Sequence, residues 1–61
     1  MKPVCKLVGE DGNIFNLIGI ASRALKTAGE PERAEEMKRR VLQSGSYDEA
    51  LRVIVEFVEV E

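Results

Sequence analysis

The segment from Asn13 to Ala28 constrains the fold more than any other part of the chain, because it is the longest and most apolar helical pattern. Its apolar side chains recur every three or four residues, and the strict alternation of a strand fails within it. They occupy positions 14, 17, 18, 21, 25 and 28, and Phe15, Ile20 and Ala24 widen this face. A helix with so wide an apolar face is expected to lie between other elements.

Turn-forming residues define both ends of this expected helix. Asp11 or Asn13 is placed to accept a hydrogen bond from a free backbone N–H at its start. Gly29 supplies the left-handed residue that ends it. Gly19, in the middle, costs roughly 1 kcal/mol relative to alanine, so we expect another helix or strand to approach closely there.

The sequence Glu30-Pro31-Glu32 opens a second helix, since proline is tolerated in a first turn and acidic side chains stabilise the positive end of the helix dipole. Its narrow apolar stripe consists of Ala34, Met37, Val41 and Leu42. Most other positions are charged, with two ion pairs expected at i,i+4 spacing, Glu35 with Arg39 and Glu36 with Arg40. Such a helix covers one side of a domain and faces water on the other.

A third helix begins at a capping box, in which the Ser46 hydroxyl accepts from the Glu49 amide and the Glu49 carboxylate reaches back. Its apolar face consists of Tyr47, Ala50, Leu51, Ile54, Val55 and Val58. The end of this helix is ambiguous, because residues 52–61 are rich in β-branched side chains. We expect a helix to about Glu56, followed by a short strand.

Another short strand is expected from Pro3 to Val8, where the side chains alternate between two faces. The expected fold is therefore one small α+β domain spanning residues 1–61. It has three helices and two short terminal strands that pair, in the order β-α-α-α-β. Alternation alone leaves open whether the strands run parallel or antiparallel.

Composition excludes several classes of function. With a single cysteine, Cys5, and no histidine, the chain has no internal disulfide and no expected zinc site. A formal net charge of -2 disfavours nucleic acid as a partner. No apolar run is long enough to cross a bilayer, and an unpaired thiol fits a reducing compartment. We expect a cytoplasmic protein with no membrane contact, no metal and no cofactor.

No residue pattern predicts catalysis. Cys5 lacks a histidine to act as its base. The turn at residues 9–13 does not match a phosphate-binding loop, and Glu10 and Asp11 would repel a phosphate. A chain this short also has little room for an enclosing cleft. We therefore expect a protein that is not an enzyme.

Two sets of residues are candidates for binding. The candidate interaction residues are Phe57, Val58 and Val60. If the last segment is a strand, Phe57 faces outward as an aromatic anchor; if the third helix includes it, Phe57 packs in the core. The second set is the only basic cluster, Arg33, Lys38, Arg39 and Arg40. It would suit a small nucleic-acid-binding regulator, but we favour a solvated helix face with ion pairs.

Two stretches carry a resemblance, Cys5 to Phe15 and Gly45 to Leu51, together with Val58 to Val60 near the end. With the helices between them, they are similar to a family of very short, uncharacterised bacterial proteins, some of them carried on prophages or other mobile elements. The resemblance implies a bacterial or phage source and a self-contained domain. It supplies no active site to carry over.

The function expected from these observations is a small protein-interaction or accessory module. The chain is 44% apolar, and it has neither a disulfide nor a metal site to stabilise so small a core. Its β-prone ends would leave a sheet edge open to pairing. We therefore expect a protein partner or a second copy of the chain, as in a homodimer.

Overall fold

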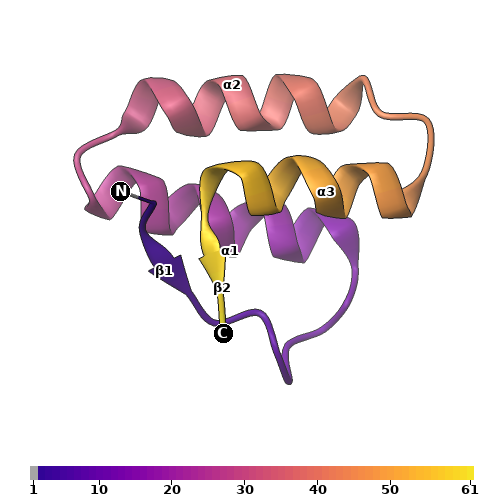
Figure 1. Ribbon diagram of the computed structural model, residues 1–61, viewed down its shortest axis with the longest axis horizontal. Helices are drawn as coiled ribbons and strands as arrows, with labels where there is room; N and C mark the ends of the chain where they lie inside the picture. Colours follow the sequence, from indigo (N-terminus) through magenta and orange to yellow (C-terminus); the bar gives the residue numbers. More distant parts are fainter. Residues whose placement is uncertain (1) are drawn as a thin grey trace.

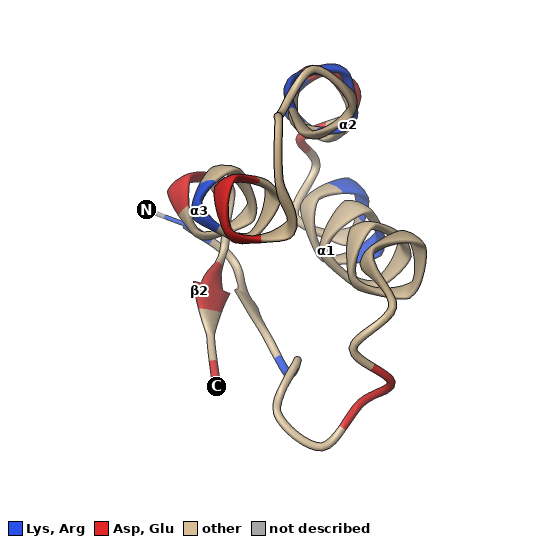
Figure 2. Ribbon diagram, turned by 90° about the vertical axis from the view of Figure 1, so that its right-hand side faces the viewer, with Lys and Arg blue, Asp and Glu red and all other residues tan. Residues whose placement is uncertain are grey.

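The computed structural model describes residues 2–61 and contains three helices and two short strands in the order β-α-α-α-β. The elements are β1 (Val4–Cys5), α1 (Ile14–Thr27), α2 (Pro31–Leu42), α3 (Tyr47–Phe57) and β2 (Glu59–Val60). The predicted α+β fold is confirmed. In Figure 1, α1 and α3 run in one direction and α2 in the opposite one. Viewed end on, the three helices form a triangle with the strands below α3 (Figure 2).

Local hydrogen bonds explain where α1 begins and ends. The Asn13 side chain accepts from the backbone N–H of Phe15 at 2.9 Å, which makes it the N-cap. Asp11 accepts from the Asn13 N–H at 3.0 Å, so both predicted capping residues act in succession. At the other end Gly29 has a φ of 81°, the left-handed conformation predicted for it.

The strands form a two-stranded parallel sheet, which resolves the orientation that the sequence leaves open. Val4 lies opposite Glu59, and Cys5 lies opposite Val60. The Glu59 N–H donates to the carbonyl of Pro3 at 2.8 Å, and the Glu61 N–H donates to that of Cys5 at 3.0 Å. The first strand is shorter than the predicted Pro3–Val8 segment. Beyond it, the N–H groups of Leu7 and Val8 both donate to the Glu61 carbonyl, at 3.1 and 3.3 Å, so the regular ladder stops there.

The core contains apolar side chains from all three helices, from the first strand and from the residue that follows α3. These are Cys5, Leu17, Ala21, Leu25, Ala34, Met37, Val41, Ala50, Ile54, Phe57 and Val58. Within each helix they recur at intervals of three or four residues, so each helix contributes one face. Of the residues expected on the stripe of α2, only Leu42 is left exposed. No helix within residues 2–61 is long and apolar enough to cross a membrane.

The surroundings of Gly19 differ from those predicted for it. A Cβ built at this position would meet no atom within 4 Å, so no element of the chain approaches it. The glycine lies on the outer surface of α1, because the side of the helix that carries Leu17, Ala21 and Leu25 faces the core.

The side-chain pairs on α2 and at the start of α3 also differ from those predicted. Glu35 pairs with Lys38, at 3.1 Å, instead of Arg39. Arg40 pairs with Glu56 of α3 instead of Glu36, because the packing of the two helices brings these side chains together. The Ser46 hydroxyl does accept from the Glu49 N–H, at 3.2 Å. The Glu49 carboxylate, however, accepts from the N–H of Gly45, at 3.0 Å.

Candidate interaction surface

Three helix ends meet at one end of the bundle. Because α1, α2 and α3 alternate in direction, the start of α1, the end of α2 and the start of α3 lie together, at the right of Figure 1. A groove opens between these ends. Its walls come from α1 (Ile14, Phe15 and Ile18), from α2 (Val41 and Leu42) and from the α2–α3 turn and α3 (Ser44, Gly45, Ser46, Tyr47 and Ala50). We call this surface the end groove.

The walls of the end groove carry no charged side chain, although one third of the residues in the chain are charged. Several of its large side chains are open to solvent. Phe15 is 70% exposed, Leu42 71% and Tyr47 47%. A contiguous apolar surface of this kind on a small protein is typical of a contact site.

Hydrogen bonds hold the turn beside the groove in place. The Tyr47 hydroxyl donates to the carbonyl of Gly12, which joins the start of α3 to the loop before α1. The Ser44 hydroxyl donates to the carbonyl of Val41 at 2.5 Å, at the end of α2. The groove is therefore largely formed before any partner binds, which lowers the entropic cost of association.

The structure places the predicted interaction residues elsewhere. Phe57 is 3% exposed and Val58 is fully buried, so neither is a surface anchor. The physical reason is that α3 continues through Phe57, one residue beyond the predicted end, and places its ring on the same side as Ala50 and Ile54. Val60 remains exposed and lies opposite Cys5 on the adjacent strand. Phe57 thus follows the core alternative that the sequence leaves open.

The four basic residues of α2 do not form one free surface. Arg33 pairs with Glu30 at 3.2 Å, and Lys38 pairs with Glu35. The guanidinium groups of Arg33 and Arg40 lie 4.9 and 5.5 Å from the centre of the Phe57 ring, within cation–π range. Arg39 is exposed to solvent. Arg33 and Arg40 therefore cover Phe57 at the α2–α3 interface, and Lys38 and Arg39 do not.

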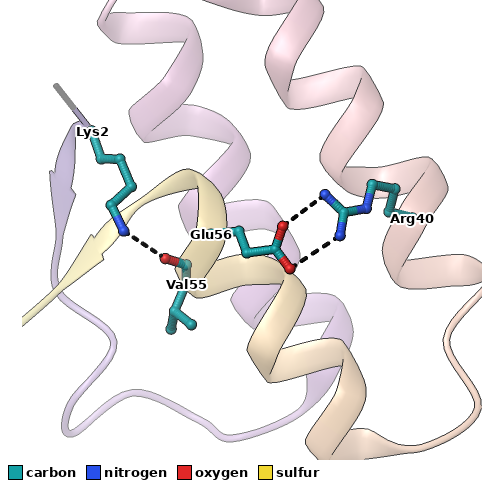
Figure 3. A network of polar contacts seen from close by, with 4 residues as sticks. All are labelled: Lys2, Arg40, Val55 and Glu56. Atoms are coloured by element: carbon teal, nitrogen blue, oxygen red, sulfur yellow. Dashed lines mark hydrogen bonds and ion pairs between the residues drawn. The ribbon is translucent and has the colours of Figure 1, made fainter.

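Arg40 and Glu56 form a two-pronged ion pair between α2 and α3 (Figure 3). The two nitrogen–oxygen distances are 2.9 and 3.1 Å. The hydrogen bond from Arg40 lowers the pKa of Glu56 below its ordinary value of 4.5 and raises that of Arg40. Beside this pair, the Lys2 ammonium donates to the carbonyl of Val55 at 2.9 Å (Figure 3). It provides a cation at the C-terminal end of α3, whose last turn contains none.

Cys5 lies against the core, and its burial raises the pKa of its thiol. The raised pKa keeps the thiol protonated at neutral pH and slows its reactions as a nucleophile. Within residues 2–61 there is no group of three or more histidine, cysteine, aspartate or glutamate side chains placed to hold a metal ion.

The sequence pattern did not predict the end groove. Periodicity assigns Phe15, Leu42 and Tyr47 to the apolar faces of their helices, but it does not show that the neighbouring helix fails to cover them. One signal was present, since the apolar face from Ile14 to Ala28 exceeds half of the helix circumference.

Comparisons of the chain with protein-family models, with curated proteins and with solved structures find no match.

Proposed function

We propose that this protein is a small, non-enzymatic interaction module that self-associates through the end groove. The observation that carries the proposal is the uncharged apolar wall of the groove, with Phe15 and Leu42 each about 70% exposed. Burial of large apolar side chains is the main source of favourable free energy in association.

A second copy of the chain is the occupant that the groove suits best. A symmetric contact requires one patch that contains both a projecting group and a recess, because each copy offers the same surface. The end groove has both, with the Phe15 ring exposed at its rim and a hollow between α1 and the α2–α3 turn. Since its walls are uncharged, two copies meet there without repulsion between like charges.

The size of the molecule sets the expected strength of this dimer. A standard interface buries roughly 800 Å² on each partner. The accessible surface of the chain is 4072 Å², so such an interface would use roughly a fifth of it. The groove and its rim form only part of that area, and we therefore expect association in the micromolar range rather than a permanent dimer.

Sedimentation velocity over a concentration series tests the proposal. We expect a shift from monomer to dimer as the concentration rises from low micromolar to near millimolar. Leu42→Asp should abolish the shift, because it places a charge in the groove at an exposed position that folding does not require. Val8→Asp is the matched control, since Val8 is 67% exposed but lies outside the groove.

Two outcomes would contradict the proposal. One is a wild-type protein that remains monomeric at the highest concentration. The other is a Leu42→Asp variant that associates as strongly as the wild type while circular dichroism shows both to be folded. If Val8→Asp lost association to the same extent as Leu42→Asp, the contact would not be specific to the groove.

A further inference from the structure

The outer side of α1 carries a second surface, which shares Phe15 with the end groove and is otherwise separate from it. Two shallow hollows lie along this helix and share Gly19 and Arg23, so they are continuous with each other. At one end Phe15 and Ile20 line the hollow together with the polar Asn16. At the other end are Lys26 and, from the neighbouring helix α2, Lys38. We call these seven residues the α1 stripe.

The α1 stripe is basic, although the chain as a whole is acidic. Helix α1 contains Arg23 and Lys26 and no acidic residue, which gives it a charge of +2. Since the whole chain has a formal charge of -2, the remainder carries -4. Figure 2 shows basic but no acidic segments on α1, both kinds on α2 and α3, and acidic segments on β2 and in the loop before α1. The three ion pairs found within residues 2–61 involve neither Arg23 nor Lys26.

Gly19 lies at the middle of the stripe without a structural reason inside the chain. It is within a regular helix, its φ is not positive, and no atom would meet its Cβ within 4 Å. A glycine in a helix interior destabilises the fold by roughly 0.5–1 kcal/mol relative to alanine. What the missing side chain does provide is a notch in which the backbone of another molecule can approach α1 closely.

We propose that the α1 stripe binds an acidic amphipathic helix of another protein. Apolar side chains of the partner lie against Phe15 and Ile20, its backbone comes closest to α1 at Gly19, and its carboxylates pair with Arg23 and Lys26. Lys38, which already pairs with Glu35, lies beside this contact. From Phe15 to Lys26 the stripe runs about 16 Å along the helix axis, the length of about three helical turns. Charge complementarity favours an acidic partner and disfavours a neutral one.

A helix fits these features better than nucleic acid does. The stripe offers three cations, one of them already paired with Glu35, in a chain whose formal net charge is -2, whereas binding to phosphates is driven by a basic excess. Phe15 is the one aromatic side chain of the stripe, and Arg23 is the one cation that lines the same hollow. A single ring offers no platform for a run of stacked bases.

Binding of a synthetic peptide tests this proposal independently of self-association. The probe is a helical peptide with leucine at i, i+3 and i+4 positions and glutamate elsewhere, and its counterpart has lysine in place of every glutamate. Binding is followed by the amide chemical shifts of the Leu42→Asp variant, which removes the proposed dimer contact. We expect the acidic peptide to bind and to shift resonances along α1 and at Lys38, and the lysine peptide not to bind.

Matched variants locate the contact. Arg23→Glu should weaken binding of the acidic peptide about 5- to 10-fold, because it replaces an attraction with a repulsion. Arg52→Glu makes the same change in net charge on the exposed side of α3 and should leave binding within about twofold, since it lies away from the stripe. Gly19→Gln keeps the helix and adds no charge, and it should weaken binding severalfold by filling the notch.

Several results would overturn the proposal. Absence of binding by the acidic peptide, or equal binding of the lysine peptide, rejects an acidic partner. An equal effect of Arg52→Glu and Arg23→Glu would show that only net charge matters. If Gly19→Gln binds the acidic peptide as tightly as the wild type does, the backbone of the partner does not approach α1 closely at Gly19. A single-stranded RNA that competes for the same resonances more tightly than the peptide would identify nucleic acid as the partner instead.

Discussion

Gly19 and Gly29 show how one residue type serves two different purposes ten positions apart. At neither position would an added Cβ meet another atom within 4 Å, so space does not explain either of them. Gly29 has a φ of 81°, a conformation that costs an ordinary residue roughly 1–2 kcal/mol. Gly19 has an ordinary helical backbone, in which alanine is the more stable residue.

The same substitution at these two positions is therefore expected to have opposite effects. Gly19→Ala should raise the free energy of unfolding by roughly 0.5–1 kcal/mol, because alanine has the higher helix propensity. Gly29→Ala should lower it by roughly 1–2 kcal/mol, because it forces a side chain into the left-handed region. Urea denaturation of both variants and the wild type at one protein concentration measures the two changes. A destabilising Gly19→Ala would show that this side of α1 is already packed.

At the scale of the elements, α2 and α3 are joined by the ion pair of Arg40 and Glu56 above the buried ring of Phe57. The folded-state pKa of Glu56 is lowered, so the pair stabilises the fold fully above the ordinary value of 4.5. Its contribution is lost as the pH falls through the lowered pKa, where the carboxylate becomes protonated. Because both groups are exposed to solvent, the contribution is small and decreases with added salt.

The Glu56→Gln variant tests this pH-dependent contribution of the ion pair to stability. At pH 7 the variant should unfold at slightly lower urea concentration than the wild type, and the difference should shrink below pH 4.5 and vanish at lower pH. Urea titrations of both proteins across this range check the prediction. Glu10→Gln is the matched control, because the Glu10 carboxylate lies in the loop before α1 and forms none of the three ion pairs within residues 2–61. A pH-independent difference would assign the effect of Glu56→Gln to packing.

Sequence predicted the elements well because their signals are local. The cap at Asn13, the proline at the start of α2 and the serine at the start of α3 each act within a few residues, and all three lie where expected. Phe57 was ambiguous, because a short apolar run of β-branched residues fits a strand or a buried helix equally. The predicted partner of Arg40 was wrong, because its actual partner lies on another helix. The exposure of Leu42 was not predicted either, because it depends on which side chains of other elements cover it.

At the scale of the whole molecule, the parallel pairing of β1 with β2 closes the fold over Cys5. The N–H groups of Glu59 and Glu61 donate to the carbonyls of Pro3 and Cys5, so the N–H of Val60, between them, points away from β1. This alternation follows from the geometry of a strand, in which successive backbone groups point to opposite sides. The thiol of Cys5 reports on the closure, because it is buried and its pKa is raised.

Glu59→Pro should open the sheet, because proline has no N–H to donate. We expect a loss of roughly 1–3 kcal/mol in the free energy of unfolding, the cost of leaving a carbonyl of the ladder without its partner. Alkylation of Cys5 by iodoacetamide, followed by mass spectrometry, should be faster than in the wild type. Val60→Pro should have the smaller effect on both measurements, since it leaves the donors of Glu59 and Glu61 in place. Equal effects would show that the sheet adds little to the fold.

The pairing of Val4 with Glu59 also has a consequence for the time course of folding. The two residues are 55 positions apart (59 − 4), and closing a flexible loop of that length costs about 3.5 kcal/mol in chain entropy. Each helix and each helix pair forms from residues much nearer in sequence, at a lower entropic cost. On a ribosome, β1 is made before the helices and yet waits for residues 59–61 to emerge before it gains its partner. Until then its backbone groups and the thiol beneath them remain open to other molecules.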